Sequence, residues 1–113
     1  MSKYGNRKTT VDGFGFDSAK EARRYTELAL LQRAGEISDL RRQIRYQLIP
    51  PQYIDGKQVE RPVDYVADFV YVDNRTGRTV IEDVKSKATK KLPAYIIKRK
   101  LVLLKYGIRI REV

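Results

Sequence analysis

The stretch that most constrains the fold is a strand–turn–strand pattern over residues 63–85. The segment VDYVADFVYVD is rich in β-branched and aromatic residues, which favour β-strands. The turn-forming residues DNRTGR come next, and the segment RTVIEDVK follows them. Two strands joined by so short a turn pair antiparallel. We therefore expect a β-hairpin over residues 63–85, with a sheet built around it.

One acidic residue, Asp68, lies in the middle of the first strand of this hairpin. A carboxylate flanked by apolar neighbours is at least partly buried, which is costly unless it is paired, hydrogen-bonded or bound to a metal ion. Physical chemistry alone therefore marks Asp68 as a candidate site residue. Strict alternation along the strand puts these side chains on one face: Asp64, Val66, Asp68, Val70 and Val72.

The second strand of the hairpin places an anion beside a cation. Asp83 and Lys85 share one face of an extended strand, whereas Glu82 and Val84 point to the other. If the turn centres near residues 75 and 76, Asp68 comes opposite about residue 83. Two carboxylates ~5 Å apart repel each other unless a cation lies between them. An acid and a lysine two residues apart also occur in many solvated strands.

The chain is strongly basic. Its 113 residues include 24 Lys and Arg against 14 Asp and Glu, which gives a formal net charge of +10. Such an excess predicts a polyanionic partner, nucleic acid before an anionic membrane surface. No acid occurs from residue 84 to residue 111, although Lys and Arg recur throughout this segment. A whole segment of helix and strand that carries only positive charge favours contact with a polyanion over simple solvation.

The residue types that are missing narrow the chemistry. The chain has no Cys and no His. Disulfides, thiolate or imidazole metal ligands and histidine acid–base catalysis are therefore excluded, which leaves carboxylates, Lys, Tyr and Ser. The N-terminus has no signal-peptide core and the apolar runs are short, so we expect a cytoplasmic protein.

The remaining elements follow from capping residues and periodicity. A helix is expected from Asp17 or Ser18 to Gly35, and a half-buried strand follows it up to Pro50 and Pro51. Residues 52–62 contain Asp55-Gly56 and are expected to form a loop or hairpin tip.

The C-terminal part is expected to contain a helix and a final strand. Pro93 suits the first turn of a helix that ends near Gly107, and residues 108–113 form the last strand. The length fits one domain, over residues 13–113. Residues 1–12 are expected to be a flexible basic arm, which either follows a phosphate backbone or is a frayed terminus.

Glu21 has two interpretations. Ser18-Ala19-Lys20-Glu21 fits a capping box, in which Glu21 folds back to the backbone N–H of residue 18 and needs no catalytic role. In the alternative, Glu21 points from the first turn of the helix into an active site.

The expected order of elements and four charged positions resemble the PD-(D/E)xK nuclease superfamily. The matching residues are Glu21 in the first helix, Asp68 in the second strand, and Asp83 with Lys85 in the third strand. The stretch VADF…EDVKS is similar to the PDF…E-x-K-G stretches of small phage endonucleases and Holliday-junction resolvases. The resemblance covers residues 16–112.

Three positions depart from the pattern of that superfamily. Ala67 replaces the proline that names the motif, and Ser86 stands where a glycine is common. Glu82 competes with its neighbour Asp83 for the ligand position. Strand alternation from Lys85 selects Asp83, whereas a β-bulge would select Glu82.

The resemblance implies a fold and an activity. The fold is an α/β (α+β) restriction-endonuclease-like core in the order α-β-β-β-α-β, with a central mixed sheet flanked by helices. The activity is that of a divalent-metal-dependent endodeoxyribonuclease. Mg²⁺ or Mn²⁺ would be held by Asp68 and Asp83, with Glu21 and the carbonyl oxygen of Val84 as further ligands. Lys85 would orient the attacking water or help to deprotonate it.

The implied substrate is branched or otherwise structured DNA, as in phage DNA recombination. No recognition helix with a base-reading pattern is evident, and resolving a four-way junction needs two symmetric incisions, hence a homodimer. The side chains expected to contact phosphates are Lys87, Lys90, Lys91, Lys98 and Lys100.

Two other functions fit parts of the sequence. A non-catalytic basic nucleic-acid-binding module would explain the charge but not an acid within an apolar strand. A nicking or flap nuclease on the same fold would use the same residues on another DNA structure.

Overall fold

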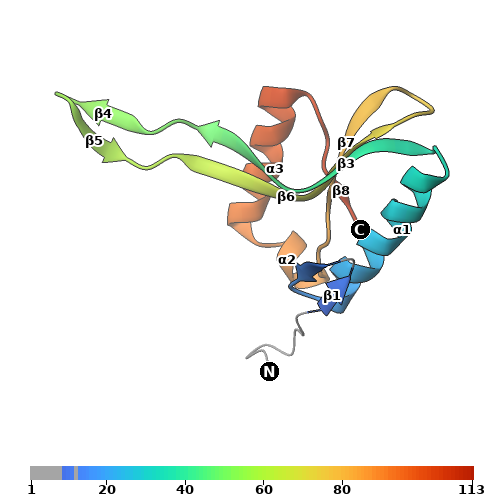
Figure 1. Ribbon diagram of the computed structural model, residues 1–113. Coiled ribbons are helices and arrows are strands. Elements are labelled where there is room, and N and C mark those ends of the chain that lie inside the picture. Colours follow the sequence, from blue (N-terminus) through green and yellow to red (C-terminus); the bar gives the residue numbers. More distant parts are fainter. Residues whose placement is uncertain (1–8, 12) are drawn as a thin grey trace. The chain divides into compact units, whose positions relative to one another are not determined.

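The computed structural model describes residues 9–11 and 13–113, so residues 1–8 and 12 of the expected N-terminal arm lie outside the described residues. The fold mixes α-helices and β-strands, as expected. The elements in chain order are β1 (Thr9–Val11), β2 (Phe14–Phe16), α1 (Ala19–Arg33), β3 (Ile37–Ile49), β4 (Gln52–Ile54), β5 (Lys57–Glu60), β6 (Val63–Asp73), β7 (Arg78–Asp83), α2 (Lys87–Lys90), α3 (Pro93–Tyr106) and β8 (Arg111–Glu112) (Figure 1).

A central sheet has the strand order β3-β6-β7-β8. The tight turn between β6 and β7 makes these two strands antiparallel, whereas β7 and β8 are parallel, so the sheet is mixed as predicted. Two small antiparallel hairpins, β1–β2 and β4–β5, accompany it. The β4–β5 hairpin lies within the predicted loop or hairpin tip. The short helix α2 was not predicted.

Contacts divide the chain into two units, which are described separately. The first contains the residues up to Leu40 and Tyr71–Thr79, and the second contains Arg41–Val70 and Val80–Val113.

In the first unit, α1 has the expected caps. The Ser18 Oγ accepts the Glu21 N–H at 3.1 Å, which confirms Ser18 as the N-cap. At the other end Gly35 adopts a φ of 81°, and the Glu36 N–H reaches the Leu31 carbonyl at 2.9 Å. This is a Schellman-type end, for which glycine is suited because it has no Cβ.

The β6–β7 turn is held by local hydrogen bonds. Asp73 accepts the Gly77 N–H on its carbonyl at 2.7 Å and the Arg75 N–H on its carboxylate at 2.9 Å. The neighbouring Asn74 donates its side-chain amide to the Gly35 carbonyl at 2.9 Å. These bonds fix the turn and hence the register of the hairpin.

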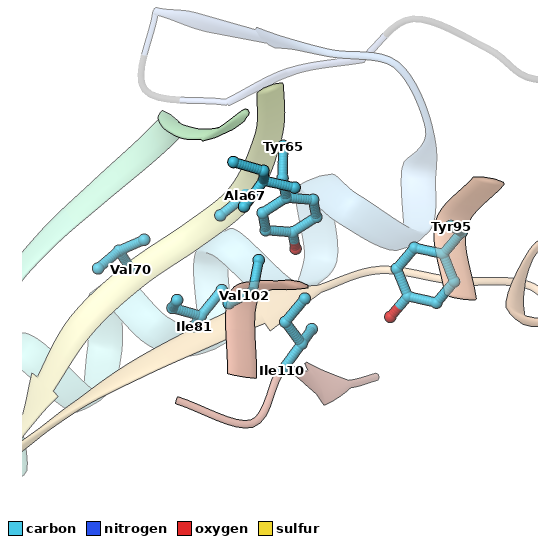
Figure 2. Packing of buried hydrophobic residues seen from close by; sticks show 8 residues of the cluster. Tyr65, Ala67, Val70, Ile81, Tyr95, Val102 and Ile110 are labelled. Atoms are coloured by element: carbon cyan, nitrogen blue, oxygen red, sulfur yellow. The ribbon is translucent and has the colours of Figure 1, made fainter. Parts of the chain in front are cut away.

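The second unit has a buried apolar core between strands and α3. Figure 2 shows most of its side chains, among which the hydroxyl oxygens of Tyr65 and Tyr95 are the polar atoms. Among the described residues, no helix is long and apolar enough to cross a lipid bilayer. The buried cluster consists of Leu48, Tyr65, Ala67, Val70, Ile81, Tyr95, Val102 and Ile110.

Burial along β6 differs between the two predicted faces, with one exception. Tyr65, Ala67, Phe69 and Tyr71 are buried, whereas the residues that alternate with them are half-buried or exposed except for Val70. Val70 is fully buried, so the strand is covered on both faces at that residue.

Strand β8 continues the sheet beside β7. The Val113 N–H donates to the Asp83 carbonyl at 3.0 Å, and the Lys85 N–H donates to the Val113 carbonyl at 3.1 Å. The backbone on both sides of Val84 is therefore fixed by the C-terminal segment.

Candidate active site

The carboxylate of Asp83 is the centre of a polar cluster in the second unit. Asp83 ends β7 and is only 2% exposed. Its Oδ2 accepts a hydrogen bond from the Tyr65 hydroxyl at 2.8 Å and lies 3.2 Å from the Lys85 Nζ. Two donors therefore converge on one oxygen of Asp83.

Asp68 lies beside this cluster. Its Oδ2 accepts the backbone N–H of Val84 at 2.8 Å, and its carboxyl group is close enough to that of Asp83 to raise the Asp83 pKa. The structure thus brings Asp68 of β6 close to Asp83 at the end of β7. The Asp68 side chain remains half-buried.

The environment of Asp83 favours its protonated form. Burial raises its pKa from 3.8 to about 7, and the hydrogen bond and negative charge of Asp68 act in the same direction. Lys85 and Tyr65 oppose this rise but do not cancel it. Two adjacent carboxyl groups that resist joint ionisation are a site at which a cation would be stabilising.

Lys85 is held from a second side. Its Nζ lies 4.7 Å from the centre of the Tyr95 ring, at cation–π distance. The Tyr95 hydroxyl donates to the Glu112 Oε2 at 2.6 Å, and this bond together with burial raises the Tyr95 pKa. The Lys85 ammonium is therefore positioned between the Asp83 carboxylate and an aromatic ring whose own orientation is fixed.

The neighbouring acid, Glu82, has a different set of contacts. It is fully buried, and its Oε2 lies 3.8 Å from the Arg111 Nη1. The ammonium of Lys85 contacts Asp83. This geometry matches the choice that strand alternation makes between Glu82 and Asp83.

Gln43 contributes from β3 and was not anticipated. Its side-chain amide donates to the Asp68 Oδ1 at 3.4 Å, and its backbone adopts a φ of 52°. A left-handed conformation is unfavourable for a residue with a Cβ, by about 1 kcal/mol or more, and such strain clusters at functional sites. Tyr65 and Tyr95 were also missed as site residues, because no pattern in the sequence marks a tyrosine whose hydroxyl or ring serves a distant side chain.

The donor set suits a hard divalent cation only in part. Within residues 9–11 and 13–113, no group of three or more Asp, Glu, His or Cys side chains comes together as a metal cage. Mg²⁺ is commonly held by one or two carboxylates, with waters and substrate phosphates completing its shell. The paired carboxyl groups of Asp68 and Asp83 fit that mode of binding. Because the negative charge of Asp68 opposes the ionisation of Asp83, a bound cation would allow both groups to be ionised.

The other predicted residues lie in α1 and in the segment that contains α2 and α3. Glu21 is buried in the first turn of α1, in the first unit, and its role as a ligand stays a prediction. The predicted phosphate-binding lysines belong to the second unit, three of them exposed and two half-buried. Lys87 and Lys90 lie in α2, Lys91 caps its C-terminus, and Lys98 and Lys100 lie in α3.

Comparison with known proteins gives a family. Residues 1–111 match DUF1064, which is described as a protein of unknown function. The chain belongs to this family. No curated protein and no solved structure matches it.

Proposed function

We propose that this protein is a divalent-metal-dependent endodeoxyribonuclease that hydrolyses phosphodiesters in branched or otherwise structured DNA. The observation that carries the proposal is the convergence of Asp68, Asp83 and Lys85 on one buried position. Carboxylates can hold a divalent cation, and an ammonium group beside them can position the attacking water or offset charge on the phosphate.

The carboxylates of Asp68 and Asp83 would hold Mg²⁺ or Mn²⁺, with the carbonyl oxygen of Val84 as a further donor. Glu21 is included as a fourth ligand from the superfamily resemblance alone. A divalent cation bound there would offset the negative charge of the scissile phosphate.

The protein's own groups have distinct roles in this proposal. Lys85 orients the attacking water and offsets charge that develops on the phosphate oxygens. Tyr65 occupies the Oδ2 of Asp83 together with Lys85, which leaves the Oδ1 of Asp83 for the cation. Tyr95 limits the positions open to the Lys85 ammonium. Tyr65 and Tyr95 are therefore positioning residues.

The element series α1, β3, β6, β7, α3 and β8 supports the proposal of a restriction-endonuclease-like core, to which the small hairpins and α2 are additions. The acid-free segment from residue 84 to residue 111 supports DNA as the partner. Contacts from its lysines to phosphates would be independent of sequence, so DNA shape would decide where cleavage occurs.

A cleavage assay tests the proposal. The purified protein is incubated with a synthetic four-way junction, a flap, a linear duplex and a supercoiled plasmid, each with Mg²⁺, Mn²⁺ or EDTA. We expect metal-dependent cleavage that is strongest on the branched substrates. Asp83→Asn and Lys85→Ala should bind the junction but not cut it.

Matched controls separate the site from general effects. Asp64 lies in the same strand as Asp68, and its carboxylate pairs with the exposed Arg45 at 2.9 Å. Asp64→Asn should therefore leave cleavage unchanged. Cleavage by Asp83→Asn or Lys85→Ala at the parent rate would contradict the assignment of the site. Junction binding without cleavage under any metal would favour the non-catalytic binding module.

A further inference from the structure

The short strand β8 places one charged residue beside each acid at the end of β7. In their parallel register Arg111 is opposite Glu82, and Glu112 is opposite Asp83. Residues paired in this way point to the same face of a sheet. The Arg111 Nη1 lies 3.8 Å from the Glu82 carboxylate, in agreement with this placement. The Glu112 side chain therefore lies on the face that carries Asp83, beside the candidate site.

The Glu112 carboxylate is bonded to other side chains of this site. Its Oε2 accepts the Tyr95 hydroxyl at 2.6 Å and lies 3.8 Å from the Arg99 Nη1. A separation of 2.6 Å is typical of a strong, charge-assisted O–H···O⁻ hydrogen bond. In the part of the chain that the structure describes, no three acidic side chains form a group that could hold a metal ion. Glu112 is therefore placed to act through Tyr95 and not as a third ligand.

The hydrogen bond to Glu112 affects how the Tyr95 ring interacts with Lys85. The Lys85 Nζ lies 4.7 Å from the centre of this ring, where a cation is attracted by the negative face of the π-system. A hydroxyl that donates to a carboxylate is polarised, and the ring gains electron density. Tyr95 is buried, and cation–π attraction is stronger where water is excluded. The charge of Glu112 therefore strengthens the attraction between the ring and the ammonium.

Lys85 needs a contact that persists when a cation binds. Its side chain has many rotamers, and fixing one of them costs conformational entropy. The ion pair with Asp83, at 3.2 Å, holds the ammonium in the metal-free protein. A divalent cation at Asp83 would offset the charge of that carboxylate and weaken the ion pair, whereas the contact with the Tyr95 ring would remain. The ring then determines where the ammonium lies during cleavage.

We propose that Glu112 is a positioning residue that acts on Lys85 through the Tyr95 ring. Its carboxylate fixes and polarises the ring, and the ring keeps the Lys85 ammonium beside Asp68 and Asp83 when a cation is bound. The effect of Glu112 on cleavage rests on the proposed nuclease function, whereas its effect on the Lys85 side chain does not. The two effects are therefore measured separately.

The first measurement is the proton chemical shift of the Lys85 ε-methylene group, by NMR in EDTA and without DNA. A methylene over an aromatic face is shielded, so this signal should lie upfield of those of exposed lysines; its loss in Lys85→Arg assigns it. Glu112→Gln keeps an acceptor oxygen but removes the charge, and Tyr95→Phe keeps the ring but removes the hydroxyl. Each should lose part of the shielding. The double variant should lose no more than Tyr95→Phe alone, because the connection through the hydroxyl is already broken.

The second measurement is steady-state cleavage of the four-way junction with Mg²⁺. Glu112→Gln and Tyr95→Phe should each lower kcat about threefold to tenfold with KM unchanged, since only the position of Lys85 is altered. The double variant should be no slower than the slower single variant. If the parent does not cleave any DNA, the nuclease proposal fails, and the chemical shift of Lys85 alone decides the role of Glu112.

The matched control is Glu27→Gln, because the exposed Glu27 of α1 pairs with Arg24 at 3.1 Å. This variant should leave the Lys85 signal and cleavage at the parent values. A Lys85 signal that does not move in Glu112→Gln would overturn the proposal. Additive losses in the double variant would do the same, because they would show that Glu112 acts by a route other than the Tyr95 hydroxyl.

Discussion

The raised pKa of Asp83 leads to a stability prediction that needs no substrate. Burial, with Asp68 beside it, raises the pKa of Asp83 from 3.8 to about 7. Between these values the folded protein retains a proton that the unfolded chain has lost. The contribution of Asp83 to the free energy of unfolding is therefore largest below about pH 4 and falls as the pH rises to 7.

The magnitude follows from the size of the shift. The whole rise corresponds to about 4 kcal/mol, and the part lost between pH 5 and pH 8 to about 2 to 3 kcal/mol. Asp83→Asn keeps the shape of the side chain and removes its titration. We expect the metal-free parent to lose that much more stability than Asp83→Asn over this pH interval.

Urea unfolding at pH 5, 6, 7 and 8 in EDTA, followed by circular dichroism, measures the difference. The control is Asp64→Asn, which should follow the parent curve, since Asp64 pairs with an exposed arginine rather than a second carboxyl group. Parallel curves for the parent and Asp83→Asn would refute the reasoning, because they would show that Asp83 ionises equally easily in both states.

Three further predictions concern the same cluster and its surroundings. Mg²⁺ at ten times its dissociation constant should stabilise the parent at pH 8 by about 1.4 kcal/mol and Asp83→Asn by much less, as measured by urea unfolding; equal stabilisation would place the ion elsewhere. Tyr65→Phe should lower cleavage about tenfold with junction affinity unchanged, since one donor to Asp83 is lost, and an unaltered rate would deny Tyr65 a positioning role. Replacing a predicted phosphate-binding lysine with Gln should reduce the slope of log affinity against log salt concentration by about 0.9 for each lysine that contacts a phosphate, as measured by fluorescence anisotropy. An unchanged slope would show that the replaced lysine does not contact DNA. The lysines to replace are Lys87, Lys90, Lys91, Lys98 and Lys100.

Features that depend on neighbouring residues could be predicted from the sequence. Ser18 caps α1, Pro93 begins α3, and Gly107 ends α3 with a φ of 71°. Capping depends on the chemistry of one or two residues at a helix end, so it is visible without knowledge of the fold. The proximity of Asp68 and Asp83 is also a local matter, because a tight turn sets the register of the strands on either side of it.

Contacts that depend on how elements pack could not be predicted. The Tyr95 ring meets Lys85 only because α3 lies against the strands in one orientation, and the Tyr65 hydroxyl meets Asp83 only because these two side chains turn toward each other from the neighbouring strands β6 and β7. Nothing in the neighbourhood of either tyrosine along the chain indicates its partner. Glu21 could be predicted in part. Its backbone N–H donates to the Ser18 side chain, as the capping box requires. The capping pattern does not indicate whether the Glu21 carboxylate has a second role.

The backbone of Val113 is hydrogen-bonded on one side to Asp83 and on the other to Lys85. A Val113→Pro substitution would remove the N–H that the Asp83 carbonyl accepts, while leaving the apolar cluster of the second unit intact. Amide exchange at Lys85 would then accelerate ahead of any global unfolding, so the end of β7 would fray in a protein that otherwise stays folded.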